Sequence, residues 1–202
     1  MIRLEKEGGL WIVTLNRPDK ANALTPAMLA RLADIAESAT EARALILTGE
    51  GHVFSAGADL DAARAGMTLS PDWERLSNAL AALPALKVAA LNGTLAGGGM
   101  GMALACDLRI AVPEALFFYP VMRLGFLPQP SDCRRLVGLI GPARARLILM
   151  AGARLDADEA LAIGLIDRIV PAQDLMATAR ELVADVLAAE PDIARGIARL
   201  CS

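Results

Sequence analysis

The sequence predicts one α/β domain. Short apolar stretches typical of strands alternate along the chain with stretches of helical spacing, and this alternation favours an α/β over an all-α protein. Two of the apolar strands run into glycine-containing turns, each followed by a helix. The chain has 202 residues, 55% of them hydrophobic and 3% aromatic, which is enough for one substantial core and hardly for two. We therefore expect a single domain over residues 1–202, with a core over about 1–170 and a C-terminal helical segment over about 171–202.

The first half of the chain begins with a predicted hairpin. Strands are expected over residues 2–6 and 10–15, joined by a pair of glycines. Thr25 is expected to cap a helix that begins at Pro26 and ends near Ser38, because a hydroxyl residue followed by proline is a common helix start. The pattern then predicts, in order, a buried strand over 44–48, a helix over 71–83 and a strand over 86–91.

The second half continues the same alternation. Ser131 is expected to cap a helix, and Gly141 to begin another that ends near residue 152. Asp156 and Glu159 have the spacing of a capping box, and Pro171 opens the final helical stretch. The remaining predicted elements are a helix over 98–106, strands over 109–112 and 116–118, an extended segment over 165–170 and a helix over 191–200.

The two glycine turns are the most informative feature for function. They read Ser-Ala-Gly-Ala-Asp-Leu over residues 55–60 and Gly-Gly-Gly-Met-Gly over residues 97–101. A helix start leaves backbone N–H groups unpaired at the positive end of the helix dipole, and glycine allows a ligand to approach closely. Two such ends brought together can hold one oxyanion. The turns therefore indicate stabilisation of an enolate or tetrahedral oxygen on a thioester carbonyl.

Composition excludes several classes of partner. The net charge is −3, and one tyrosine and two tryptophans cannot interleave with cations as in base stacking, so nucleic acid is not expected. The three cysteines, Cys106, Cys133 and Cys201, are widely spaced and the chain has one histidine, so we expect neither a disulfide framework nor a metal site. Reduced cysteines, with a charged N-terminus where a signal peptide would be apolar, favour a cytoplasmic protein.

An uncharged stretch of 19 residues, Val88 to Cys106, raises the question of a membrane span. Its length is the only support for a span. Five glycines divide it into a buried strand, a turn and a short helix, so burial inside the protein explains it better and no membrane partner is expected.

The sequence matches neither of two common nucleotide-binding motifs. Its glycines at 97, 98, 99 and 101 do not match G-x-G-x-x-G, and no acidic residue follows about 20 positions later at a strand end. No Gly-Lys-Ser/Thr occurs, which excludes a P-loop.

A series of short motifs along nearly the whole chain carries a family resemblance. They are Asn16-Arg17-Pro18, Asn22-Ala23-Leu24, Leu47-Thr48-Gly49-Glu50-Gly51, Phe54 to Leu60, Asn92-Gly93, Gly97-Gly98-Gly99, Ala105 to Ile110, Leu124-Gly125, Leu155-Asp156-Ala157 and Ala160 to Ile166. Singly each is weak, but in this order the chain resembles the crotonase, or enoyl-CoA hydratase/isomerase, superfamily. The resemblance implies a spiral of ββα units with C-terminal helices, here shorter than usual. It also implies an acyl-CoA substrate, no cofactor beyond the coenzyme A that is part of that substrate, and a homotrimer or hexamer.

The resemblance also implies positions for the binding site. The thioester carbonyl would accept hydrogen bonds from the N–H groups of Ala56 and Gly98. The adenosine end would lie near the segment that contains Lys20, Ala21 and Ala23, with Lys20 a phosphate contact. The adenine edge would meet backbone at Ala58, Asp59 and Leu60.

The chain departs from the family pattern at the catalytic acids. In the hydratases one glutamate lies two residues after the third glycine and another follows the proline of a later loop; here these positions hold Gly101 and Val121. Gln129 stands where some relatives carry a catalytic aspartate, and an amide cannot act as a base. Each lost acid or base is typically worth about 10² to 10⁴ in rate, so neither ordinary hydration nor isomerisation is expected.

Four polar residues remain as candidates near the expected site. Tyr119 lies two residues before Val121 and would share its face in an extended segment, which makes it the first side-chain candidate. Asp132 follows Ser131 at a predicted helix start, where capping is the commoner role of an acid. The other two are Cys133, at the same helix start, and His52, in a polar turn.

Two functional hypotheses follow from the sequence. The first is an acyl-CoA-binding enzyme that stabilises a thioester oxyanion or enolate through backbone amides, with its reaction left open. The second is a non-catalytic protein that binds coenzyme A or serves as a scaffold with the same fold. Turnover of acyl-CoA thioesters separates the two.

Overall fold

The computed structural model describes residues 1–201 and contains two β-sheets. The large sheet has the strand order β1-β2-β3-β5-β7-β9, and the small one the order β4-β6-β8. All pairs within both sheets are parallel except β1 with β2, which form an antiparallel hairpin. The strands are β1 Ile2–Glu7, β2 Leu10–Leu15, β3 Ala44–Gly49, β4 Val53–Ser55, β5 Leu86–Leu91, β6 Thr94–Ala96, β7 Leu108–Ala111, β8 Phe117–Phe118 and β9 Arg168–Ile169.

The strand order follows from a repeated ββα unit. Along the chain, β3, β5 and β7 join the large sheet, and the next strand in each case, β4, β6 or β8, joins the small one. A helical segment follows each pair and leads back to the large sheet. The chain therefore winds as a spiral of ββα units, as the sequence predicted. Each turn of the spiral carries one loop from the end of a small-sheet strand into a helix.

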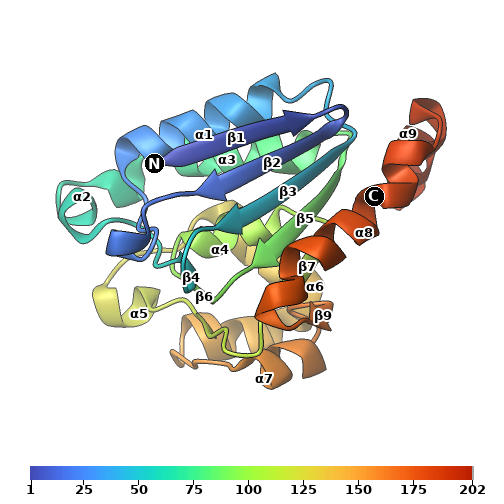
Figure 1. Ribbon diagram of the computed structural model, residues 1–202. Coiled ribbons are helices and arrows are strands. Elements are labelled where there is room, and N and C mark those ends of the chain that lie inside the picture. Colours follow the sequence, from blue (N-terminus) through green and yellow to red (C-terminus); the bar gives the residue numbers. More distant parts are fainter. Residues whose placement is uncertain (202) are drawn as a thin grey trace.

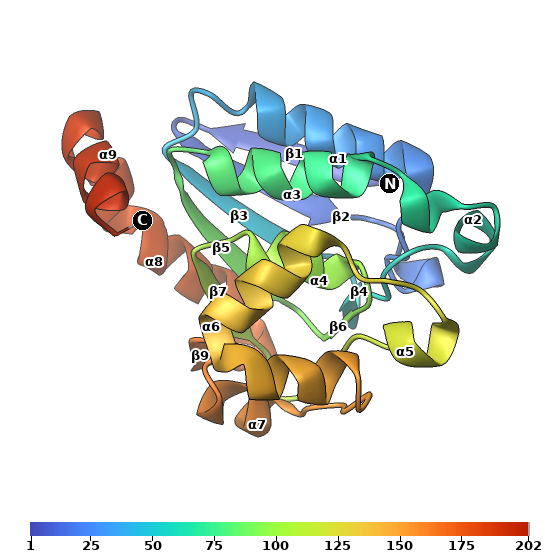
Figure 2. The same cartoon turned by 180° about the vertical axis from the view of Figure 1, so that it is seen from behind.

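The helical segments cover both faces of the large sheet. Helices α1 Pro26–Ser38 and α3 Asp72–Ala82 lie side by side over one face (Figure 2), while α8 Leu175–Ala188 packs against β3, β5 and β7 on the other (Figure 1). The others are α2 Leu60–Arg64, α4 Gly99–Leu104, α5 Val121–Leu124, α6 Pro130–Leu149, α7 Ala157–Ala162 and α9 Pro191–Leu200, with 3-10 turns η1 Pro18–Lys20, η2 Met67–Leu69 and η3 Ala172–Asp174.

The ends of several helices confirm the capping predictions. The Thr25 side chain accepts a hydrogen bond from the backbone N–H of Met28 at 3.2 Å, and the capping box of Asp156 and Glu159 is complete. Helix α6 is kinked at Gly141, where φ is 80°, so the expected second helix start is a bend within one element. Helix α9 has no buried residue and extends away from the sheets (Figure 1).

Two short strands were missed, and two local predictions were wrong. The short strands β4 and β6 were not predicted, because three residues are too few to give a periodic pattern. Val121 begins helix α5 rather than continuing an extended segment. Ser131 is not a cap, since Gln129 occupies that position and both the N–H and the hydroxyl of Ser131 donate to Glu74, at 2.9 and 2.7 Å.

Two cations are buried near the first residues of β5 and β7, which are interior strands of the large sheet. The Lys87 side chain is 5% exposed, and its ammonium contacts the Asp107 carboxylate at 2.9 Å and donates to the carbonyls of Leu83 and Ala85. Arg109 donates to the carbonyls of Cys106 and Leu165. Each buried cation is thus surrounded by acceptors, as burial of a charge requires.

Candidate active site

A pocket of about 320 Å³ lies where the two glycine turns meet α5 and the segment between α2 and α3. Its walls are mostly apolar. They consist of Ala56, Ala58, Leu60, Ala63, Arg64, Thr68, Trp73, Gly97, Gly98, Tyr119, Pro120, Val121, Leu124, Phe126, Leu127 and Gln129. The two turns, predicted from sequence to act together, therefore line one cavity.

The two turns touch each other through glycine. Gly57 and Gly97 both have a positive φ, of 88° and 53°, which disfavours other L-residues. A Cβ atom at Gly57 would lie 3.0 Å from the carbonyl oxygen of Ala96 and 3.1 Å from the nitrogen of Gly98. Only a residue without a side chain allows the backbones this close approach.

The free amides of the site are those of Ala58 and Gly98. The N–H of Ala56 donates to the carbonyl oxygen of Ala21 at 3.0 Å, so Ala56 cannot serve as the predicted oxyanion donor. The N–H of Leu24 donates to the carbonyl of Gly57, and the carbonyl of Leu24 accepts from the N–H of Asp59. In this parallel bridge the N–H of Ala58, which lies between them, points away from Leu24. Within residues 1–201, the N–H groups of Ala58 and Gly98 donate to no acceptor, and both residues line the pocket. The unpaired amide at the first turn is therefore that of Ala58, two residues after the predicted Ala56.

A buried asparagine holds the first turn against the preceding loop. Asn22 is fully buried; its side chain accepts from the N–H of Arg17 at 2.8 Å and donates to the carbonyls of Glu50 and Val53, at 3.0 and 2.7 Å. The Ser55 hydroxyl donates to the carbonyl of Asn22. These bonds fix the loop that supplies the Ala21 carbonyl.

Of the residues expected at the adenosine end, four lie beside the turn and two lie in the pocket wall. Lys20, Ala21, Ala23 and Asp59 do not line the pocket, whereas Ala58 and Leu60 do. Arg17 contacts the Asp59 carboxylate at 2.8 Å and donates to the carbonyl of Ala23. Asp59 also caps α2, and the hydrogen bond from Arg17 lowers the pKa of this carboxyl below its ordinary value. The two segments expected at the adenosine end, residues 20–23 and 58–60, therefore lie next to each other. The Asp59 side chain is held by Arg17 and by the start of α2.

The position of the first missing glutamate is filled by another carboxylate. A Cβ atom at Gly101 would lie 2.5 Å from Oδ1 of Asp132, closer than real atoms approach. Asp132 is in the first turn of α6 and is 3% exposed. Gly98, Gly101 and Asp132 line one small cavity. Glycine at position 101 thus makes room for an acid supplied by a different helix.

Tyr119 connects this carboxylate to the pocket. Its hydroxyl donates to Oδ2 of Asp132 at 2.9 Å, and the ring lines the pocket wall. Burial, and to a lesser extent the negative charge of Asp132, raises the pKa of Tyr119, so its phenol stays protonated. The two candidates that the sequence treated separately are one hydrogen-bonded pair.

Burial decides the charge state of Asp132. Desolvation raises its pKa to about 6, and the charge of Glu74 acts in the same direction. The hydrogen bond from Tyr119 and the nearby Arg135 oppose this rise. The Asp132 carboxyl therefore changes protonation close to neutral pH, which suits a group that gives and takes a proton.

The remaining polar wall residues have structural contacts. Gln129 donates to the carbonyl of Thr68 at 3.0 Å, joining the start of α6 to η2. Trp73 donates to the carbonyl of Met67 at 2.9 Å, and its ring would meet a Cβ atom at Gly98 at 2.8 Å. Neither side chain carries a transferable proton in the neutral range. Trp73 was not singled out in the sequence, and no local signal places it against Gly98.

Comparison with known proteins identifies the family. A family model described as enoyl-CoA hydratase/isomerase matches residues 5–199. The chain belongs to this family.

The relatives of the enoyl-CoA hydratase/isomerase family span most of the chain. A probable enoyl-CoA hydratase of Mycobacterium leprae is 34% identical over 90% of this chain and 76% of its own. The short-chain-enoyl-CoA hydratase of Clostridium acetobutylicum is 35% identical over 93% and 76%. The ethylmalonyl-CoA decarboxylase of Mus musculus is 32% identical over 98% and 66%. Relatives named for hydration and for decarboxylation are thus similar to this chain over most of its length.

Solved structures agree with the family assignment. DspI of Pseudomonas aeruginosa has a TM-score of 0.90 and 33% identity, and covers 99% of this chain and 85% of that one. An enoyl-CoA hydratase from Bacillus anthracis has a TM-score of 0.86 and 32% identity, with coverage of 96% and 79%. The crotonase-type α/β fold predicted from the motifs is confirmed.

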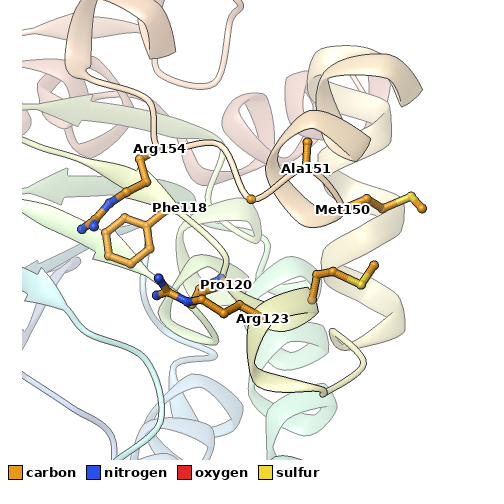
Figure 3. Close-up of a pocket in the computed structure, with 8 residues that line it drawn as sticks. Phe118, Pro120, Arg123, Met150, Ala151 and Arg154 are labelled. Carbon is orange, nitrogen blue, oxygen red and sulfur yellow. The ribbon is translucent and has the colours of Figure 1, made fainter.

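A second hollow, of about 290 Å³, shares Pro120 with the wall of the first pocket (Figure 3). Phe118, Pro120, Arg123 and Arg154 form one side, and Met150 and Ala151 the other. The guanidinium of Arg154 lies over the ring of Phe118, 4.1 Å from its centroid. Both arginines are exposed, and the residues that line this hollow include no carboxylate.

Neither a metal cluster nor a membrane span is found in the described part of the chain. No three His, Cys, Asp or Glu side chains gather there in a way that could hold a metal ion. None of the helices in residues 1–201 is long and apolar enough to cross a membrane. His52 is exposed in a turn, and Cys133 is half-buried beside Asp132.

Proposed function

We propose that this family member binds an acyl-CoA thioester in the pocket and stabilises the oxyanion of an enolate with the N–H groups of Ala58 and Gly98. The observation that supports this most strongly is a pair of backbone N–H groups without an acceptor, one on each of two turns that touch at the wall of one apolar pocket. Preorganised donors of this kind cost no reorganisation when negative charge develops. Coenzyme A, as part of the substrate, is the only cofactor the proposal requires.

Ordinary hydration is not part of the proposal. Adding water to an enoyl double bond needs an acid and a base, and Gly101 and Val121 carry neither at the positions used by the hydratases. The walls are mostly apolar, since Leu124, Phe126 and Val121 are among the residues that line the pocket, and such walls suit an acyl chain. A thioester whose α-carbon gains or loses a proton fits these walls.

Calorimetry tests the oxyanion contact directly. Butyryl-CoA is compared with S-butyl-CoA, a thioether that lacks the carbonyl oxygen. Two hydrogen bonds of about 0.5–1.5 kcal/mol each predict that the thioester binds roughly 5- to 150-fold more tightly. Equal affinities, or binding of neither compound, would count against the proposal.

A matched pair of variants isolates the Ala58 donor. Ala58→Pro removes the N–H, whereas Ala58→Ser changes the side chain and keeps it. Ala58→Pro is expected to lose most of the preference for the thioester while Ala58→Ser retains it. Far-ultraviolet circular dichroism checks that both variants remain folded.

The scaffold hypothesis is the second candidate, favoured by the missing glutamates at positions 101 and 121. It predicts binding of acyl-CoA without chemistry. Proton NMR of butyryl-CoA in D₂O separates the two, because an enolate-forming enzyme exchanges the α-hydrogens and a scaffold does not. The expected homotrimer or hexamer also stays a prediction, which sedimentation velocity tests.

A further inference from the structure

The pocket offers one protonated group in position to act on the ligand. Among the described wall residues only Arg64 and Tyr119 are titratable. Arg64 is 77% exposed at its side chain and contacts Asp61. Tyr119 is 5% exposed and faces the same cavity as Ala58 and Gly98. Any proton delivered from the wall near the donor pair therefore comes from the Tyr119 hydroxyl.

The Tyr119 hydroxyl cannot supply this proton alone, because burial opposes its ionisation. It is, however, bonded to Oδ2 of Asp132. Asp132 in turn lies within a small cavity shared with Gly98, Trp73 and Gln129, all of which also line the main pocket. The carboxylate is thus one hydrogen bond behind the pocket wall and next to the residue that carries one oxyanion donor.

Glycine at position 101 is what permits this arrangement. Any larger residue there would place its Cβ atom 2.5 Å from Oδ1 and 3.1 Å from Cγ of Asp132. The hydroxyl of Tyr119 donates to the other carboxylate oxygen, Oδ2, at 2.9 Å. Two independent features, a missing side chain and a phenol donor, therefore fix the same carboxylate.

We propose that Tyr119 and Asp132 act as one proton-transfer pair that serves the α-carbon of the bound acyl-CoA. Tyr119 is the catalytic residue of the pair, and Asp132 is a positioning residue that acts through it. The inference rests on the proposed function, since it needs an enolate held by Ala58 and Gly98.

The transfer balances without another reactant. In the forward direction, the α-carbon–hydrogen bond breaks and its electron pair forms the enolate, whose oxygen is held by the two amides. The proton moves to the Tyr119 oxygen while the Tyr119 proton moves to the Asp132 carboxylate. Tyr119 stays neutral throughout, and Asp132 ends as a carboxylic acid. The reverse step returns the proton to carbon and restores the carboxylate.

The groups around Asp132 determine its pH range. Glu74 on α3 and Tyr119 face it from neighbouring elements, and Cys133 and Arg135 lie on its own helix. Although partial burial raises the pKa of Glu74, hydrogen bonds from Ser131 and the charges of Arg134 and Arg135 outweigh it and hold this pKa below its ordinary value. Glu74 therefore stays ionised while Asp132 titrates, and abstraction of the α-proton is expected to speed up with pH until Asp132 is fully ionised.

Exchange of the α-hydrogens of butyryl-CoA in D₂O, measured from pH 5 to 8, tests the pair. Tyr119→Phe and Asp132→Asn are each expected to slow exchange by about 10² to 10⁴-fold. Calorimetric affinity for butyryl-CoA should change by less than about threefold. Wild-type exchange should rise through about pH 6 to a plateau, and the Asp132→Asn rate should not follow that profile. Asp185→Asn, an exposed acid on α8, serves as the matched control and should behave as wild type.

A spectroscopic readout keeps the proposal testable if a variant does not fold. The chain has one tyrosine, so protein labelled with ¹³C at the tyrosine ring carbon that bears the hydroxyl gives a single signal from Tyr119. That signal should shift with a midpoint near pH 6 in the wild type as Asp132 titrates.

Each outcome bears on one proposal or the other. Exchange that persists in both variants, or a tyrosine signal that is flat from pH 5 to 8, overturns the proton-transfer pair. Binding of butyryl-CoA without exchange in the wild type also overturns it and favours the scaffold. Failure to bind either coenzyme A compound overturns the proposed function itself.

Discussion

Replacing Asp132 by asparagine should change how the stability of the protein depends on pH. In the unfolded chain an aspartate has a pKa of about 3.9, whereas burial raises that of folded Asp132 to about 6. The folded state therefore binds this proton more tightly, and the carboxyl contributes stability at low pH that is lost as the pH rises through about 4 to 6.

The size of the effect follows from the two pKa values. A difference of roughly 2 pKa units at about 1.4 kcal/mol each gives a loss of about 3 kcal/mol between pH 4 and pH 8. An asparagine at position 132 has no such loss and can still accept the hydrogen bond from Tyr119. The stability of the variant minus that of the wild type is therefore expected to rise by about 3 kcal/mol over this range.

Urea unfolding at pH 4, 5, 6, 7 and 8 measures this difference. Asp185→Asn is the control, because an exposed carboxylate loses little solvation on folding. Subtracting each variant from the wild type removes the pH dependence of all other groups. If the difference in unfolding free energy between Asp132→Asn and the wild type is the same at pH 4 and pH 8, this prediction is refuted. Ionising Asp132 would then not destabilise the folded protein.

Three further substitutions test the packing around the site and the core. Gly101→Ala should destabilise the protein by about 1–3 kcal/mol through the 2.5 Å contact with Asp132, less about 1 kcal/mol gained from helix propensity. This cost should vanish when Asp132→Ala is present in the same chain. Urea unfolding of the two single variants and the double variant checks this, and additive effects would contradict it. Asn22→Ala removes the three hydrogen bonds that the buried Asn22 side chain makes to partly buried backbone groups, and it should cost about 2–4 kcal/mol. An unfolding midpoint that shows a loss of less than about 0.5 kcal/mol, as for a surface substitution, would contradict this. Asp107→Ala leaves the buried Lys87 charge without its carboxylate partner and should lower the free energy of unfolding by about 3 kcal/mol, measured by thermal unfolding. Lys87→Met in the same chain should restore most of this stability. No recovery would argue against an electrostatic origin.

Local signals in the sequence were sufficient for elements whose ends are decided by neighbouring residues. The Thr25 cap and the capping box of Asp156 and Glu159 use partners three residues away, and both are present as predicted. The hairpin of β1 and β2 likewise depends on a short turn. The family motifs then gave the ββα spiral, which no local pattern contains.

The errors fall where a distant partner takes over a local role. Ser131 would cap α6, but Glu74 on α3 accepts both of its donors. Ala56 would donate to a ligand, but the Ala21 carbonyl, positioned by Asn22, occupies its N–H. Such contacts join residues tens of positions apart, and a single sequence carries no signal for them.

The candidate acid illustrates the same limit from the other side. The sequence shows the loss at Gly101 and the presence of Asp132, but only packing reveals that the second occupies the space vacated by the first. Tyr119 was singled out because it would share a face with Val121 in an extended segment. Both residues do line the pocket, although Val121 begins a helix.

The contact between Gly57 and the second turn has a practical consequence for engineering. Because main-chain atoms of two abutting turns form the proposed oxyanion site, a side chain added at Gly57 would push those atoms apart. Val121, Leu124 and Phe126, by contrast, can be exchanged one at a time without moving those atoms. A combinatorial library that randomises these three wall positions would vary the side chains that contact the acyl group. The backbone of both glycine turns would stay unchanged in every member.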